Sequence, residues 1–180
     1  MGFSPISVVE EIAKEIRDKS DVVCNFYQLA EDVPDPRELS SEKKNLMVFD
    51  DLLLEKQNKC ESYYVRGRHS NVDCFYLAQN YFKLPRQTIR ENANFICLFP
   101  QDLKNLNHIF GDHVGSDMTG AEFRQLCKVA CEKQHGFVII DLCSKKHNGK
   151  YRSDLTSFTY QIKLKIKTFI IFSLQNGETS

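Results

Sequence analysis

The 180-residue chain has no excess of either charge, no recognisable leader and no long apolar run. Lysine and arginine number 24, as do aspartate and glutamate, so net charge indicates neither a nucleic-acid nor a membrane partner. Any basic surface must be local. The amino terminus lacks a basic-then-apolar signal pattern, and no run approaches the roughly 20 apolar residues that span a bilayer. We therefore expect a soluble, intracellular protein with no membrane contact.

The sequence also lacks a disulfide or zinc framework. Its seven cysteines form no CxxC pair, and several lie inside apolar segments. Cys127 and Cys131 have helical i, i+4 spacing, but no histidine or further cysteine stands nearby at a metal-ligand interval. We expect reduced, buried thiols. The seven are Cys24, Cys60, Cys74, Cys97, Cys127, Cys131 and Cys143.

Short apolar runs alternate with amphipathic segments, without internal repeats. This order predicts an α/β fold with a mostly parallel sheet and helices on both faces. The run 46–49 has the length of a strand buried on both faces. Further strands are expected at 72–78, 94–99 and 136–142, and 21–29 is β-prone. Helices are expected at 4–19, 55–64, 85–92, 100–113 and 119–135, with a helical turn near 36–40.

The carboxyl-terminal stretch 161–174 has a different pattern. Ile162, Leu164 and Ile166 alternate with lysines, which predicts a half-buried strand. Lysines of this kind suit an edge strand, where they block aggregation. The alternative is a lysine stripe that binds nucleic acid.

Polar residues follow each predicted strand, and ligands of open parallel sheets bind beyond the carboxyl ends of the strands. Asp50 and Asp51 follow the first apolar run, Gln79 and Asn80 the second, and Gln101 comes after the third. Asp141 ends the fourth. These residues are the candidates for a binding site.

An aspartate at the tip of a buried strand is the Walker B arrangement. In it Asp50 would hold Mg²⁺ through its waters, and Asp51 would orient the water that attacks a γ-phosphate. Gln79 suits a sensor of that phosphate or water. The alternative is a turn or helix cap, which aspartate pairs often form.

The span 66–99, together with the motif before it, carries a more specific pattern. "VFDD", "RGRHSN", an apolar strand closed by "QNYF", "IREN" and "ICLF" follow one another, and "HGFVIIDL" with "YR" comes later. In order and spacing these motifs resemble viral DNA-packaging ATPases of the FtsK–HerA branch of P-loop NTPases, nearest to the poxvirus type. The resemblance covers about residues 40–153. It implies a RecA-like fold, ATP as substrate with Mg²⁺, and double-stranded DNA as partner.

The resemblance also implies roles for single residues. Asp50 matches the metal ligand, Asp51 its catalytic neighbour and Gln79 the sensor. Arg68 falls where such motors carry an arginine that reaches the nucleotide of a neighbouring subunit in a ring. Arg66 and Arg90 are candidates for the same role or for DNA phosphate.

Several other polar residues of this span have simpler explanations. The alternative for "RGRH" is an exposed basic turn with Gly67 at positive φ. The asparagines of the matched motifs are expected to form turns and caps, and His113 and His135 to be surface or packing residues. Of the histidines, only His69 lies in a matched motif. The asparagines are Asn71, Asn80 and Asn92.

One part of the family pattern is missing. No GxxxxGK[ST] loop, which cradles the phosphates, occurs in the chain; the stretch 111–117 has two glycines but no lysine. We interpret residues 1–155 as the carboxyl-terminal part of a packaging ATPase domain and 156–180 as a tail outside the resemblance. In the complete enzyme, a ring docked to capsid or portal proteins would pump DNA at a viral replication site or virion.

Because phosphate affinity comes mainly from the missing loop, we expect this chain alone to hydrolyse ATP feebly or not at all. The alternative is a non-catalytic remnant that serves as a DNA- or protein-interaction module.

Overall fold

The computed structural model describes residues 14–16, 18, 22–52, 56–153 and 168–172 of the chain. It divides the chain into two compact units, Met1–Val33 and Pro34–Ser180, and each is described by itself. In the first unit, residues 14–16 and 18 are helical, inside the predicted helix 4–19. Residues 22–29 form no strand, so the β-prone reading of this stretch is wrong.

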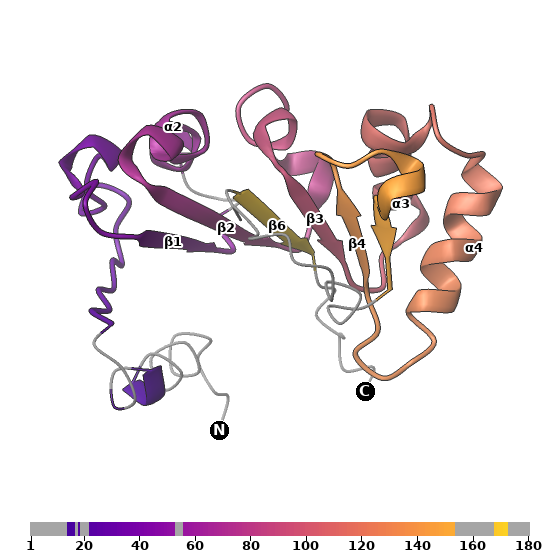
Figure 1. The fold of residues 1–180 in the computed structure, drawn as a ribbon, viewed down its shortest axis with the longest axis horizontal. Helices are drawn as coiled ribbons and strands as arrows, with labels where there is room; N and C mark the ends of the chain where they lie inside the picture. Colours follow the sequence, from indigo (N-terminus) through magenta and orange to yellow (C-terminus); the bar gives the residue numbers. More distant parts are fainter. Residues whose placement is uncertain (1–13, 17, 19–21, 53–55, 154–167, 173–180) are drawn as a thin grey trace. The chain divides into compact units, whose positions relative to one another are not determined.

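The second unit is a mixed α/β structure built on one six-stranded sheet (Figure 1). The strand order is β1-β2-β6-β3-β4-β5. Strands β1, β2, β6 and β3 are mutually parallel, whereas β4 is antiparallel to β3, and β5 to β4. The bounds are β1 Asn45–Asp50, β2 Val72–Ala78, β3 Phe95–Leu98, β4 Val138–Asp141, β5 Tyr151–Arg152 and β6 Thr168–Phe172.

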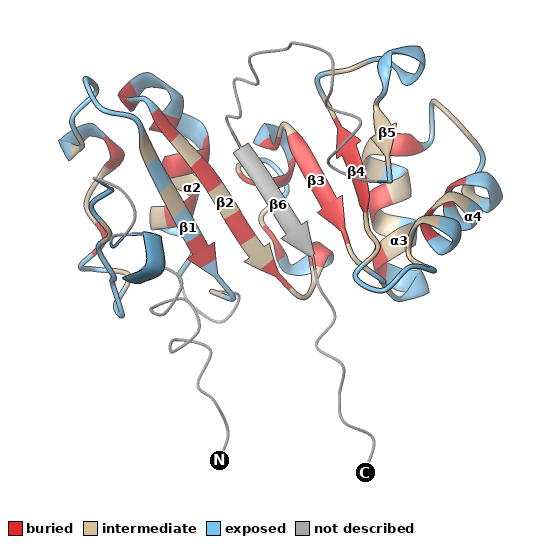
Figure 2. Cartoon of the chain, turned by 60° about the horizontal axis from the view of Figure 1, so that its bottom comes forward, coloured by how far each residue is buried: buried red, intermediate tan, exposed pale blue. Residues whose placement is uncertain are grey.

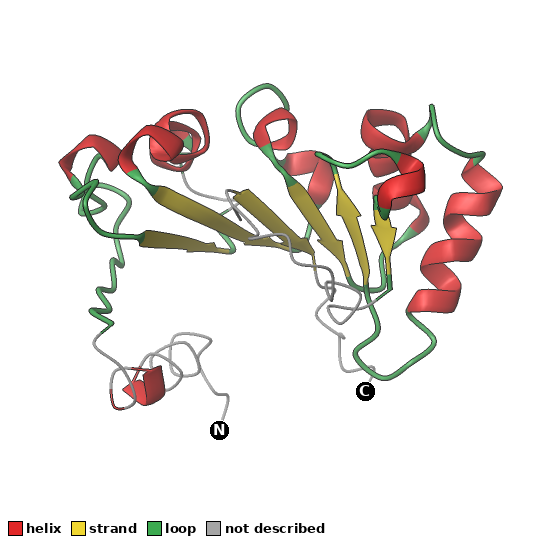
Figure 3. Ribbon diagram, viewed as in Figure 1, coloured by secondary structure: helices red, strands yellow, loops and turns green. Residues whose placement is uncertain are grey.

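Helical segments connect these strands (Figure 3). Most agree with the predicted positions, although 85–92 forms only turns and a short 3₁₀ segment. Gln57 precedes α2, and Asp102 and Thr119 cap α3 and α4 by accepting backbone N–H bonds. The helices are α2 Asn58–Arg66, α3 Leu103–Ile109, continued by a π-helical turn Phe110–Val114, and α4 Gly120–Ala130; the 3₁₀ segments are Pro36–Glu38, Gly67–Ser70, Tyr81–Lys83, Arg90–Asn92 and Lys146–Asn148.

Every residue of β3 and β4 is buried (Figure 2). Phe95, Cys97 and Ile139 form a hydrophobic core cluster, and Phe75 packs against it. On α4 the buried residues are Phe123 and Cys127, whereas Val129 is 53% exposed. Val129 follows Cys127 by two residues, which is about 200° around a helix with 3.6 residues per turn, so it lies on the opposite side of α4.

Strand β1 is not buried on both faces, contrary to the prediction from its apolar run. Phe49 is buried and packs edge-on against Tyr63 of α2, with ring centroids 5.5 Å apart. Leu46 and Val48 point to the other face and are 59% and 47% exposed. The run is apolar on both sides, but β1 lies at one edge of the sheet that the described residues form, and α2 lies on one face only.

The carboxyl-terminal tail contributes a strand to the same sheet. β6 lies between β2 and β3, with Ala78 and Leu98 both in register with Phe172. The strand predicted in this tail is therefore present at Thr168–Phe172, in an interior position of the sheet. The alternating lysines at 163–167, expected at an edge, lie outside the described residues.

Candidate functional site: the carboxyl rim of the parallel strands

The four parallel strands end at one side of the sheet, which we call the carboxyl rim, and begin at the opposite side, the amino rim. Asp50 ends β1 in register with Leu77 of β2, and Gln79 directly follows β2. Two of the predicted site segments therefore meet at the carboxyl rim, as the sequence indicated.

Asp51 and Gln79 are in direct contact. The Gln79 Nε2 amide donates to Asp51 Oδ2 at 2.9 Å. The Asp51 backbone N–H donates to Leu77 O at 3.0 Å, which carries the ladder one residue past β1. Asp51 itself has φ of 47°, a left-handed conformation that aspartate tolerates better than most residues. Asp51 thus ends the strand in a turn and still points its carboxylate at Gln79, so the turn and site interpretations are compatible.

Asp50 lies on the face of β1 that α2 does not cover, and its side chain is exposed to solvent. Partial desolvation of the carboxyl group, followed by the negative charge of Asp51, raises its pKa. A cation bound at Asp50 would offset the negative charge of Asp51 beside it.

The oxygen donors at this rim fit Mg²⁺ rather than a metal that needs a full protein ligand set. Among the described residues, no group of three or more His, Cys, Asp or Glu side chains could hold a metal ion. Asp50 and Asp51 supply two carboxylates, and Gln79 an amide oxygen. Mg²⁺ is commonly held by one or two carboxylates, with substrate phosphates and water completing its shell.

Sequence reasoning missed Gln57, which supports the loop after Asp51. Its side-chain amide donates to the Leu52 carbonyl, and its Oε1 accepts from the Tyr76 hydroxyl at 2.9 Å. Tyr76 is fully buried in β2. Gln57 thereby ties the chain beyond Asp51 to the neighbouring strand. No pattern marks it, because a glutamine just before a helix has no distinctive spacing.

Arg68 does not lie near Asp50 and Asp51 of its own chain. It belongs to the 3₁₀ segment Gly67–Ser70, which immediately precedes β2 and so lies at the amino rim. β2 spans six residue steps, or roughly 20 Å, and separates Arg68 before it from Gln79 after it. Arg66, at the end of α2, is at the same rim, and both arginines are exposed. Any role of Arg68 at a nucleotide therefore needs a second subunit.

Arg90 is held inside the protein. Its Nη1 donates to Asp112 Oδ2 at 2.6 Å, and its guanidinium lies 4.9 Å from the centroid of the Tyr81 ring. The Tyr81 hydroxyl donates to the same Asp112 oxygen at 2.8 Å, and burial is the main cause of its raised pKa. His113 contacts Tyr81 and has a pKa lowered by burial. This network joins the segment after β2 to the π-helical turn, which makes Arg90 a packing residue in this chain.

The asparagines form turns and caps, as expected. Asn71 is left-handed, with φ of 54°, and its amide donates to Lys43 O at 2.9 Å. Asn80 accepts from Phe82 N, and Asn92 donates to Thr88 O. Gly67 does not have the expected positive φ; its φ of −52° is right-handed. Gly67 is buried, and a Cβ added to it would lie 3.4 Å from Val72 O. Asn71 makes the left-handed turn instead.

Asp141 is not at the carboxyl rim. Because β4 is antiparallel to β3, Asp141 is in register with Phe95, the first residue of β3, at the amino rim. It is 5% exposed and accepts from Arg152 Nη2 at 2.8 Å, from Cys143 N and from Ser144 Oγ. Its place among the strand-end candidates was wrong, because the strand direction reverses.

Comparison with known proteins identifies no relative of this chain: no family model, no curated protein and no solved structure matches it. No helix among the described residues is long and apolar enough to cross a membrane.

Proposed function

We propose that this chain is the metal-binding part of a RecA-like ATPase domain from a motor that moves double-stranded DNA into a viral capsid. One observation supports it most: the 2.9 Å hydrogen bond between Gln79 and Asp51 at the ends of two adjacent parallel strands. Sequence positions 28 residues apart, chosen for a sensor and a catalytic acid, lie in contact.

In this proposal Asp50, Asp51 and Gln79 have separate roles, which follow from their positions at the carboxyl rim. Asp50, on the open face, would bind Mg²⁺, which when bound neutralises phosphate charge. Asp51, oriented by its left-handed backbone and by Gln79, would accept a hydrogen bond from the attacking water. Besides the group that donates to Asp51, Gln79 carries a second amide hydrogen and an oxygen, with which it would sense the γ-phosphate.

The remaining parts of the motor lie outside one copy of the chain. Arg68 is exposed at the amino rim, where only a neighbouring subunit's nucleotide could meet it. A homo-oligomeric ring docked to capsid or portal proteins supplies that arrangement. The sequence contains no Walker A loop, which favours the second candidate, a non-catalytic module that binds DNA or protein.

Mn²⁺, a paramagnetic replacement for Mg²⁺, tests the metal assignment directly. With ATP present, we expect it to broaden the side-chain amide signals of Gln79 in an NMR spectrum far more than those of Asn71 at the other end of β2. Asp50→Asn should abolish the difference. Equal broadening of both amides, or no change with Asp50→Asn, would contradict the metal site.

Steady-state ATP turnover with Mg²⁺ and duplex DNA separates the two candidates further. The purified chain should show no turnover above background. If the chain does turn over ATP and Asp51→Asn abolishes that turnover, the expectation of inactivity is wrong and phosphate binding has another source.

A further inference from the structure

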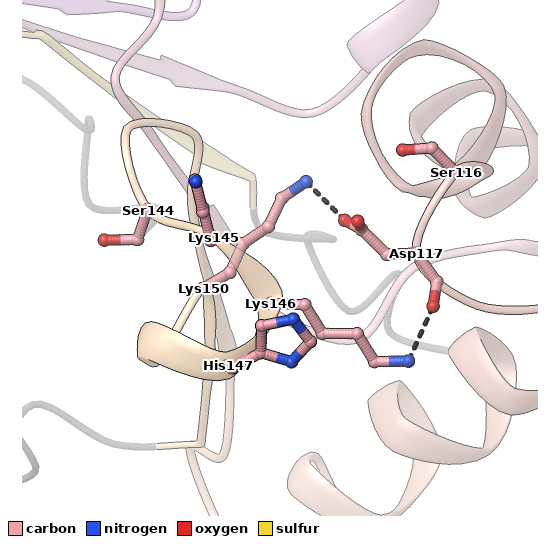
Figure 4. Close-up of a pocket in the computed structure, with 7 residues that line it drawn as sticks. All are labelled: Ser116, Asp117, Ser144, Lys145, Lys146, His147 and Lys150. Carbon is pink, nitrogen blue, oxygen red and sulfur yellow. Dashed lines mark hydrogen bonds and ion pairs between the residues drawn. The ribbon is translucent and has the colours of Figure 1, made fainter.

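A basic pocket of about 420 Å³ opens between the β4–β5 connection and the loop after the π-helical turn (Figure 4). Lys145, Lys146, His147 and Lys150 line it from the first segment, with Ser144 beside them. Ser116 and Asp117 line it from the second. Three lysines against one aspartate leave a surplus of two positive charges in a chain whose net charge is zero.

The single aspartate organises the pocket rather than neutralising it. The Asp117 carboxylate accepts from Lys150 Nζ and from the Tyr151 hydroxyl, and these bonds lower its pKa. Lys150 also donates to His113 O at 3.1 Å. Asp117 therefore takes up the charge of the one lysine that is largely buried, with a side chain 13% exposed.

The other two lysines keep their charge available. Lys146 Nζ donates to the backbone carbonyl of Asp117 at 2.6 Å, a neutral acceptor that fixes the side chain without cancelling its charge. Lys145 and His147 are exposed at the mouth. A lysine held in place by a neutral acceptor loses less side-chain entropy when an anion binds.

The loop that carries these lysines is rigidly tied to the sheet. Asp141 accepts from Cys143 N and Ser144 Oγ, and Arg152 bridges Asp141 Oδ2 to Gly149 O at 2.8 and 2.6 Å. Gly149, with φ of 77°, turns the chain where a side chain would strain it. The pocket is thus a fixed feature of the amino rim.

We propose that this pocket binds a phosphate group of a nucleic-acid backbone. Lysine ammonium groups bind phosphate as point charges, with hydroxyl and imidazole donors as support. The inference that the ligand is a phosphate rests on the pocket alone, whereas the inference that this phosphate belongs to duplex DNA rests on the proposed function. Arg68 lies just before β2 at the same rim. β2 is three strand spacings, or about 15 Å, from β4, a span that a duplex covers with several phosphates.

The test compares two double charge reversals of equal size. Lys145→Glu with Lys146→Glu changes the pocket, whereas Lys128→Glu with Lys133→Glu changes exposed residues of α4 and the turn after it. Binding of a fluorescent duplex, followed by anisotropy over a salt series, should weaken at least about tenfold for the pocket pair only. Its salt slope should fall by about 2, since each lysine–phosphate contact contributes about 0.9. Thermal unfolding of both variants shows that they fold.

A second titration, with inorganic phosphate and the imidazole signals of His147 as readout, identifies the source of the phosphate. Phosphate-dependent shifts with duplex binding equal in both variant pairs would overturn the nucleic-acid assignment in favour of a small phosphate compound. No shift and no difference between the pairs would overturn the site. DNA binding through the pocket without Mn²⁺ binding at Asp50 would contradict the proposed ATPase and leave this inference intact.

Discussion

Two aspartate sites in this chain look alike in sequence and differ in structure. Asp50 and Asp51 follow the apolar run 46–49, and Asp141 follows the apolar residues 137–140. β1 is parallel to its neighbour β2, so its aspartates lie at the carboxyl rim. β4 is antiparallel to β3, so Asp141 lies at the amino rim. The direction of the strand therefore determines whether its terminal aspartate lies at the candidate metal site or supports the basic pocket.

The surroundings of the two sites follow from that difference. Asp141 is buried, and its carboxylate is satisfied by a guanidinium, a hydroxyl and a backbone N–H. Asp51 is exposed, and Gln79 is a neutral partner. A buried carboxylate with a full set of partners has a structural task, whereas an exposed pair that repels itself has capacity left for a ligand.

Replacing an aspartate at each rim should give the largest difference in the free energy of unfolding. Asp141→Ala leaves the Arg152 side chain, only 12% exposed, without its charge partner, so we expect it to lower the free energy of unfolding by about 3 kcal/mol or more. Asp51→Ala should cost about 1 kcal/mol or less. Urea denaturation of the two variants measures both values.

A matched replacement sharpens this contrast. Asp141→Asn keeps an oxygen that accepts from Cys143 N, and its amide nitrogen can donate to Ser144 Oγ where the carboxylate accepted from it. The charge opposite Arg152 is lost, so the cost should fall between that of Asp141→Ala and none. Equal costs for Asp51→Ala and Asp141→Ala would show that burial does not distinguish the two rims.

Local patterns predicted the elements of this fold better than their arrangement. The runs 72–78 and 95–98 are strands within a residue of their expected bounds. Each is largely apolar, and turn-forming residues flank it: Asn71 and Asn80 for the first, Asn94 and Pro100 for the second. The antiparallel direction of β4 and the interior position of β6 depend on contacts between distant segments, which no local period encodes. The exposure of Leu46 and Val48 has the same origin, because a sequence does not show which strand is outermost.

For the candidate site, too, residues at strand ends were predictable, whereas contacts between distant segments were not. Asp51 and Gln79 were expected together because both follow parallel strands, and the structure places them in contact. Arg90 was misjudged, because its partner Asp112 comes 22 residues later. The basic pocket escaped notice, because Asp117 and the lysines at 145–150 come from separate segments. Whether the chain is a packaging ATPase stays a prediction.

A double-mutant cycle tests the contact on which the carboxyl-rim site depends. Asp51→Asn, Gln79→Leu and their combination should show a coupling free energy of about 0.5 kcal/mol in urea denaturation, because an exposed hydrogen bond to a charged group contributes little more. Gln101 provides the control. It follows β3, about 15 Å away by strand spacing, and donates to its own neighbour Pro100 O. Asp51→Asn with Gln101→Leu should therefore be additive, and coupling of similar size in both cycles would mean that the Asp51–Gln79 bond is not its source.

The smallest expected effect concerns Asp50, whose pKa is raised above its ordinary value of 3.8. As pH rises through the window above 3.8, the folded state holds the Asp50 proton longer than the unfolded chain does, so this group lowers stability. Asp50→Asn removes that loss and should raise the free energy of unfolding near pH 7 by less than about 0.5 kcal/mol, since solvent screens an exposed group. Well below pH 3.8 both forms are neutral, and the gain should vanish. Denaturation at the two pH values measures the difference, and a gain that does not change with pH would mean that Asp50 carries no electrostatic cost for a cation to relieve.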